Sequence, residues 1–299
     1  MRRVETIDDL RRTLDAARAA GRTVGFVPTM GYLHEGHVSL MRSARAACDV
    51  VVTSIFVNPL QFAAHEDLDD YPRDLEGDAG LAAGAGVDLL FVPSVREMYP
   101  QPVADGLLAT TVSVAGVSAG MEGASRPTHF AGVATVVAKL LSIVGPCRAF
   151  FGEKDFQQLA VVRRMVADLS MPVEVVGGET VREPDGLAMS SRNAYLSPEQ
   201  RAAAPVVHRA LRAGAAVVLA GERDPAAVRG AIAAVVAEEP LGELDYAEVV
   251  RASDLTVPSI LDPADASGDL RLLVAVRFGS TRLIDNLGVT APAAPTDRR

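Results

Sequence analysis

The sequence predicts an α/β protein in two parts: a parallel sheet with helices on both faces, followed by a small C-terminal α+β domain. Three observations carry this prediction. Short β-rich runs alternate with helix-like segments through the first part, the order that a parallel sheet with right-handed crossovers requires. Those runs are almost continuously apolar, as in a sheet covered on both faces. Beyond Arg192, two helix-start signals precede a group of strand-like runs.

The first domain, expected over residues 1–186, shows its helix and strand signals in order. Thr6 with Asp9 three residues later has capping-box spacing and predicts a helix over residues 10–20 that Gly21 ends. The elements expected beyond it are strands over residues 23–27, 50–57, 88–92 and 110–114, a helix over 130–144, a strand over 148–151, a helix over 156–169 and a strand over 173–176.

The second domain is expected over residues 187–290. Ser197 followed by Pro198 and then Gln200 is a helix start with a serine cap, and Asp224-Pro225 opens a second helix in the same style. Strand-like runs follow at residues 246–251, 270–276 and 281–286, with a turn at 278–280. Residues 291–299 are rich in Ala and Pro and are expected to be disordered. A chain of 299 residues is long enough for two such domains.

Composition and charge exclude several classes of protein. Apolar residues make up 49% of the chain, enough for a packed core. The net charge of −9 argues against nucleic acid as a partner, because such proteins neutralise phosphates with a basic surface. The longest apolar segment, residues 130–144, falls short of the ~20 residues of a membrane span. Two cysteines without metal-ligand spacing, and no signal-peptide pattern, suit a cytoplasmic protein.

The most informative motif runs from Pro28 to His37, where the first parallel strand ends and a helix begins. A helix N-terminus offers unpaired amides and partial positive charge to a phosphate, and Gly36 lets a nucleotide approach the backbone closely. His34 and His37 are three residues apart and can each donate to a phosphate oxygen. Either histidine alone could instead be a capping or core residue. The pattern His-x-Gly-His in this setting resembles the signature of the nucleotidylyltransferase superfamily, which includes the class I aminoacyl-tRNA synthetases.

Two further motifs offer positive charge. Residues 151–158 run from a strand end into a helix, and Lys154 at the end of a central strand points to the crevice where open α/β sheets bind ligands. Asp155 and Gln158 in the same stretch also have capping-box spacing. Residues 189–192, Met-Ser-Ser-Arg, lie near the expected domain boundary; Arg192 can clamp phosphates in a bidentate manner, although a polar linker would look the same.

A fourth motif, at the end of the strand over residues 50–57, is polar but uncharged. Asn58 and Gln61 could be turn residues that close this strand. If they face the crevice, their amides can hold the hydroxyl and carboxylate groups of a small acid without adding charge.

Taken together, the motifs resemble the pantothenate synthetase family over most of residues 20–290. The stretches that carry the resemblance are PTMGYLHEGH, SIFVNPLQF, RPTHFAGVATVV, FFGEKDFQQL, TVREPDGLAMSSRN and YLSPEQR. The resemblance implies a Rossmann-like N-terminal domain, a smaller C-terminal lid domain and a homodimer. It also implies an ATP- and Mg²⁺-dependent ligase that condenses pantoate with β-alanine through a pantoyl adenylate, releasing AMP and pyrophosphate.

The family's site residues carry over to matching positions of this chain. His37 matches the proton donor, and His34, Lys154 and Arg192 match residues that stabilise phosphate charge. The implied ATP contacts are Met30, Gly31, Tyr32, Leu33, His34, Glu35, Gly36, His37, Gly152, Glu153, Lys154, Asp155, Val181, Met189, Ser190, Ser191 and Arg192. The implied substrate contacts are Pro28, Thr29, Asn58, Gln61 and Gln158. Residues 62–73 match a mobile cover loop. No metal ligand can be named, and Asp78 is the one candidate for an outer-sphere role.

Three alternatives stay open at this point. A different nucleotidylyltransferase would release an adenylylated product. A noncatalytic nucleotide-binding module could use the same fold, because fold alone does not fix function. A fragment of an RNA-linked synthetase is disfavoured by the net charge.

Overall fold

The computed structural model describes residues 1–62, 68, 71–100, 108–262 and 269–292. Its contacts divide the chain into two compact units, one formed by Met1–Glu153 with Val161–Thr180 and the other by Lys154–Ala160 with Val181–Arg299. The main change of unit thus falls at residues 180 and 181, and the expected domain bounds of 1–186 and 187–290 stay a prediction. The cover loop expected over residues 62–73 and the tail over 291–299 lie for the most part outside the described residues.

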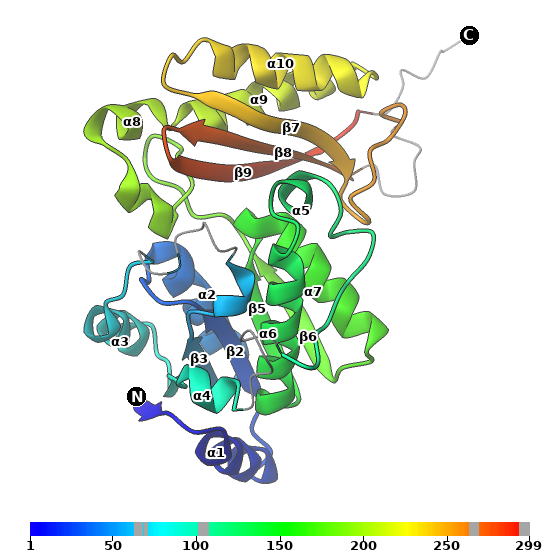
Figure 1. Cartoon of the computed structure of the whole chain (residues 1–299). Coiled ribbons are helices and arrows are strands. Elements are labelled where there is room, and N and C mark those ends of the chain that lie inside the picture. Colours follow the sequence, from blue (N-terminus) through cyan, green and yellow to red (C-terminus); the bar gives the residue numbers. More distant parts are fainter. Residues whose placement is uncertain (63–67, 69–70, 101–107, 263–268, 293–299) are drawn as a thin grey trace. The chain divides into compact units, whose positions relative to one another are not determined.

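The first unit contains a sheet of six parallel strands (Figure 1). In spatial order β1-β4-β3-β2-β5-β6, the strands are Arg2–Val4, Leu89–Phe91, Val50–Ile55, Val24–Thr29, Cys147–Gly152 and Val173–Gly178. The chain winds in one direction from β2 to β3 and β4, and in the other direction from β5 to β6. The point where the direction changes therefore lies between β2 and β5, and in open sheets of this kind ligands bind outside the carboxyl ends of the strands at such a point.

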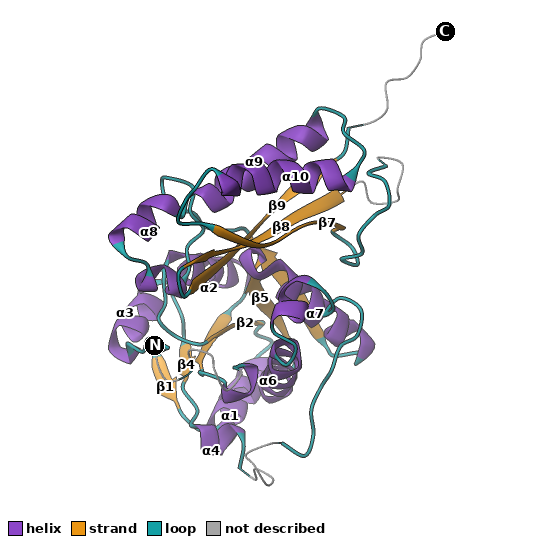
Figure 2. Ribbon diagram, turned by 45° about the horizontal axis from the view of Figure 1, so that its top comes forward, coloured by secondary structure: helices purple, strands orange, loops and turns teal. Residues whose placement is uncertain are grey.

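Helices cover both faces of this sheet, as the sequence predicts (Figures 1 and 2). Helix α2 (Glu35–Ala47) packs on β2, β3, β5 and β6 with α3 (Leu75–Gly84) beside it, whereas α6 (His129–Val144) packs on β2 and against α1 (Ile7–Ala19). The remaining elements are α4 (Val95–Met98), α5 (Met121–Ser125), α7 (Phe156–Asp168) and the short 3₁₀ helices η1 (Pro59–Gln61) and η3 (Glu153–Asp155). The first turns of α7 belong to the second unit and the rest to the first.

The sequence signals are confirmed for most elements of this unit and wrong for one. Thr6 caps α1 by accepting from the Asp9 amide, and Gly21 follows the helix with a φ of +73°. The strand expected over residues 110–114 is wrong: this segment runs beside α6, where the Val112 amide donates to Thr135 Oγ1 instead of to a neighbouring strand. Strand β1 was not expected, because three residues with two arginines at an exposed sheet edge show no apolar pattern.

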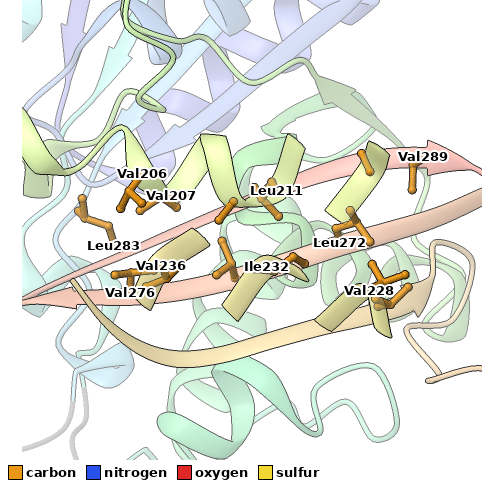
Figure 3. Close-up of a cluster of buried hydrophobic side chains, with 14 of the residues drawn as sticks. Val206, Val207, Leu211, Val228, Ile232, Val236, Leu272, Val276, Leu283 and Val289 are labelled. Carbon is orange, nitrogen blue, oxygen red and sulfur yellow. The ribbon is translucent and has the colours of Figure 1, made fainter. Parts of the chain in front are cut away.

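The second unit packs helices on one face of a three-stranded antiparallel sheet. Its elements are η4 (Ser191–Tyr195), α8 (Pro198–Ala203), α9 (Val206–Leu219), α10 (Pro225–Ala237), β7 (Glu243–Arg251), β8 (Asp269–Phe278) and β9 (Thr281–Thr290). Valine, leucine and isoleucine side chains from α9, α10 and the strands fill the core between helices and sheet (Figure 3). Both predicted helix caps, Ser197 and Asp224, are confirmed, and Gly279 turns the β8–β9 hairpin with a φ of +60°.

Within the part of the chain that the structure describes, one stretch, Pro198–Leu219, is long and apolar enough to cross a membrane by length and composition. In the structure Pro205 separates it into α8 and α9, and 56% of its most apolar window is buried inside the protein. Buried core helices commonly have this composition, because a helix packed on a sheet needs an apolar face.

Candidate active site

The loop between β2 and α2 carries both candidate histidines. His34 caps α2: its Nδ1 accepts from the Gly36 amide at 3.2 Å, and the His34 amide donates to His37 Nδ1 at 3.3 Å. The two ring centroids lie 4.2 Å apart. Because both Nδ1 atoms accept hydrogen bonds, each neutral ring carries its proton on Nε2. The capping role and the ligand role are therefore compatible, since capping uses Nδ1 and donation to a phosphate oxygen would use Nε2–H.

The backbone before these histidines is held by a carboxylate from α3. Buried Asp78 accepts from the Tyr32 amide at 2.9 Å and from the Leu33 amide at 2.6 Å. Gly31 and Tyr32 have φ angles of +87° and +51°, a region that side chains disfavour, so the loop needs this support. Burial raises the pKa of Asp78, while the two amides act to lower it. Each carboxylate oxygen of Asp78 thus supports the loop, and the outer-sphere metal role expected for Asp78 stays a prediction.

The neighbouring strand brings the next candidates to the same edge. Phe26 on β2 pairs with Ala149 on β5, and three residues further along each strand are Thr29 and Gly152. Since the strands are parallel, Thr29, Gly152 and Glu153 lie at the carboxyl edge with the histidine loop. Thr29 is buried, and its hydroxyl donates to the Ser54 carbonyl and accepts from the Gly31 amide.

Asn58 and Gln61 lie at the end of β3, and the hydrogen bonds of Asn58 determine how both amides are oriented. Asn58 Oδ1 accepts from the Leu60 amide at 3.3 Å, and its Nδ2 donates to the Gly132 carbonyl at 3.2 Å. Backbone groups have fixed roles, so these two bonds fix the side-chain amide. Asn58 Nδ2 must then donate to Gln61 Oε1, at 3.3 Å, and Gln61 presents its Nε2 donor toward Met30 Sδ at 2.7 Å.

This pair is also held by residues far along the chain, at the ends of α4 and α5 and at the start of α6. The Tyr99 hydroxyl donates to Asn58 Oδ1 at 2.8 Å, and burial raises the pKa of Tyr99 well above its usual value. The Gln61 carbonyl accepts from Arg126 at 3.2 Å and from His129 Nδ1 at 3.0 Å. Asn58 therefore uses its full hydrogen-bonding capacity within the protein, which favours support of Gln61 over direct contact with a substrate.

The remaining candidates belong to the second unit. Lys154 Nζ lies 3.6 Å from Asp155 Oδ1, and its side chain is 18% exposed. Residues 181–189 form a tight antiparallel loop in which the Met189 amide donates to the Val181 carbonyl at 3.0 Å. Ser190 caps η4 by accepting from the Arg192 amide. A small cavity in this unit is lined by Lys154, Leu187, Ala188, Ser190, Asn193, Val207, Leu283, Ile284 and Asp285.

The candidates thus fall into two groups. The first unit brings together the stretch Pro28–His37 with Asn58, Gln61, Gly152 and Glu153. The second unit brings together Lys154, Asp155 and the stretch Val181–Arg192, with half-buried Gln158 in the first turn of α7.

Comparison with known proteins identifies the family of this chain. The family model of pantoate-beta-alanine ligase matches residues 2–288. The pantothenate synthetase of Brucella anthropi is 55% identical over 288 residues, covering 96% of each chain, and that of Brucella suis biovar 1 is 52% identical over 302 residues, covering 100% of this chain and 99% of the relative. The chain belongs to the pantoate–β-alanine ligase family. Its activity is the ATP-dependent ligation of pantoate to β-alanine.

Solved structures agree with this assignment and confirm the fold class. Pantothenate synthetase from Thermus thermophilus superposes with a TM-score of 0.87 at 52% identity, covering 96% of this chain and 99% of that one. Pantoate-beta-alanine ligase from Francisella tularensis, solved as a complex with beta-gamma ATP and beta-alanine, has a TM-score of 0.76 at 32% identity, covering 99% of this chain and 100% of that one.

The sequence interpretation missed several residues that hold this ligase's candidate site together. Tyr99 has no local pattern that marks it, because its partner Asn58 lies 41 residues away. Asp78 was named only as an outer-sphere metal candidate, and its support of the loop 45–46 residues away was not expected. Arg126 and His129 stand within the stretch RPTHF, which contributed to the family resemblance but was not assigned a role.

Proposed function

We propose that the ligation proceeds through a pantoyl adenylate formed at the carboxyl edge of the six-stranded sheet. The observation that carries this proposal is the position of the N-terminus of α2. It lies where the winding of the sheet changes direction, and its two capping histidines can each donate through Nε2–H. The proposed ATP contacts come from two groups of residues. One group is Met30–His37 with Gly152 and Glu153, and the other is Lys154 and Asp155 with Val181 and Met189–Arg192.

In the first step the protein must position the substrates and stabilise charge, and no general base is needed. A carboxylate with a pKa of ~4 is already ionised at neutral pH. The pantoate carboxylate attacks the α-phosphorus in line, and the bond from that phosphorus to the pyrophosphate oxygen breaks. His34, His37, Lys154 and Arg192 offset the charge that collects on the leaving pyrophosphate.

Gln61 and Gln158 are proposed to orient pantoate, with Pro28 and Thr29 beside them. For Gln61 the hydrogen bonds of Asn58 support a specific role, since they make Nε2 the donor end of the amide; it carries two hydrogens, and while one contacts Met30 Sδ the other can donate to a ligand oxygen. We assign Asn58 to holding Gln61 in this orientation.

Magnesium is proposed to arrive with ATP and not to be held by a site of its own. Among the described residues, no group of three or more His, Cys, Asp or Glu side chains is arranged to hold a metal ion. Mg²⁺ commonly binds phosphates and water with few protein ligands, so the residues present fit MgATP as the substrate. In that form the ion supplies further charge stabilisation on the phosphates.

In the second step the neutral amine of β-alanine attacks the acyl carbon, the nitrogen loses one proton as the amide bond forms, and AMP leaves with the electrons of the broken acyl–phosphate bond. A mixed anhydride hydrolyses in water, so the site must exclude solvent before β-alanine reacts. The C-terminal unit is the proposed lid.

A nucleotidylyltransferase that releases the adenylylated acid as its product is the alternative outcome. The two are separated by measuring pyrophosphate and AMP with pantoate alone and then with both substrates. AMP release that depends on β-alanine supports the proposed mechanism, whereas accumulation of pantoyl adenylate as the end product contradicts it.

We also propose a cytoplasmic homodimer. Free Cys48 and Cys147 suit a reducing compartment, and the dimer follows the family resemblance. Light scattering during size-exclusion chromatography tests the dimer, and a monomeric mass at micromolar concentration would contradict it.

A further inference from the structure

The loop over residues 181–189 is tied to strand β9 by an arginine. Arg182 donates to both carboxylate oxygens of Asp285, at 2.6 and 3.0 Å, and to the Gly186 carbonyl at 3.1 Å across its own loop. The Asp285 side chain is 2% exposed, and this bidentate geometry fixes the guanidinium in one plane. The loop is therefore pinned both at its tip and to the sheet.

The next residue of β9 holds the other proposed phosphate contact. Asn286 Nδ2 donates to the Lys154 carbonyl at 2.8 Å, and the Asn286 amide donates to Asp285 Oδ1 at 2.8 Å. Adjacent residues of a strand point to opposite faces. Asp285 pairs with Val274 in the helix-covered core, whereas Asn286 pairs with Leu273 on the other face.

Two consecutive residues of one strand thus hold segments that are separated by nearly thirty residues in the sequence. One segment contains Lys154. The other leads from the loop over residues 181–189 into Ser190 and Arg192, and the Arg192 amide donates to Ser190 Oγ. The same small cavity is lined by Lys154, Ser190 and Asp285. The Arg182–Asp285 pair is neutral as a unit, so it adds no net charge beside a nucleotide.

We propose that Asp285 and Asn286 are positioning residues for ATP, which set the Lys154 ammonium and the Ser190–Arg192 segment in the relative geometry that grips the phosphates. This inference rests on the proposed assignment of Lys154 and Arg192 to the nucleotide. Neither β9 residue touches a reacting atom; each acts through a backbone or loop that does.

The test compares Asn286→Leu, Arg182→Lys and a control, Glu248→Gln. Leucine keeps the size of asparagine but cannot donate to the Lys154 carbonyl, and lysine keeps the charge of Arg182 but not the two-pronged contact. Glu248 pairs with Arg229 elsewhere in the same unit and controls for the loss of an ordinary ion pair. We expect the KM for ATP to rise about 3- to 10-fold in each β9-contact variant, the scale of one lost hydrogen bond. The KM values for pantoate and β-alanine should stay within twofold of wild type.

A double variant separates positioning from general stability. If Asn286 acts through the lysine, Asn286→Leu should have little further effect on kcat/KM for ATP once Lys154→Ala has removed the ammonium. Full additivity of the two changes would overturn the proposal, as would an unchanged KM for ATP in folded Asn286→Leu and Arg182→Lys. If Lys154→Ala alone leaves the rate unchanged, the assignment of Lys154 to the nucleotide fails, which is a different result from a failure of the β9 pair.

Discussion

Replacing Gly132 with alanine should displace the segment that carries Gln61. Gly132 lies in the first turns of α6, and a Cβ added there would lie 2.1 Å from the Leu60 carbonyl oxygen and 2.7 Å from the Gln61 Cα. Cβ atoms essentially never approach another heavy atom within 3.0 Å, so the two backbones must separate by at least about 0.9 Å. Helix α6 is buried along most of its length and cannot yield easily. The η1 segment must move instead, and the Asn58–Gly132 hydrogen bond of 3.2 Å breaks with it.

The expected size of the effect follows from that displacement. A misplacement of about 1 Å can cost about 10²-fold in rate, so kcat/KM for pantoate should fall by about that factor. The steric overlap should also lower the stability of the protein. Helix propensity alone predicts the opposite, a gain in stability, because alanine favours a helix over glycine by about 1 kcal/mol.

Steady-state kinetics with pantoate as the varied substrate, together with thermal unfolding, measure both effects. The matched control is Gly80→Ala in α3, where an added Cβ meets nothing within 4 Å. The control should keep the wild-type rate and gain about 0.4–1 kcal/mol of stability. A Gly132→Ala enzyme with wild-type kcat/KM and unchanged stability would refute the reasoning.

Two further predictions follow from the site and from the second unit. His37→Ala should lower kcat by about 10²–10³. His37→Asn keeps a polar side chain beside the His34 amide, so it should recover the stability of the helix but not the rate. Recovery of both stability and rate would contradict the role of the imidazole ring. Burial, with help from Arg182 and Arg212, lowers the pKa of His208, although Asp285 acts against this. Below pH ~6.5 the unfolded chain therefore binds a proton that the folded chain does not. The urea midpoint should fall from pH 7.5 to pH 5.5, and His208→Asn should reduce that fall; an equal fall in the variant would show that other groups cause it.

Local patterns in the sequence predict the parts of the site in which neighbours along the chain act together. The stretch Pro28–His37 is such a case, because its strand end, glycine and helix start lie within ten residues, and the structure gives His34 the capping role that the sequence left open as an alternative. The caps at Ser197 and Asp224 are local in the same way. Short-range signals of this kind are readable without knowing the fold.

The supporting contacts could not be predicted in the same way, since they join residues distant in sequence. Asn58 bonds Gly132 across 74 residues, and Arg182 bonds Asp285 across 103. No periodicity or spacing marks such partners before the fold is known. The error at residues 110–114 has the same origin, because a β-rich run becomes a strand only where a neighbouring strand is present to pair with it.

The central claim, that ligation passes through a pantoyl adenylate, is tested most directly by isotope exchange between labelled pyrophosphate and ATP. With MgATP and pantoate but no β-alanine, we expect label to enter ATP, because the first step is then reversible and complete in itself. Without pantoate no exchange should occur. Exchange that is absent with pantoate, or that requires β-alanine, would contradict the two-step mechanism.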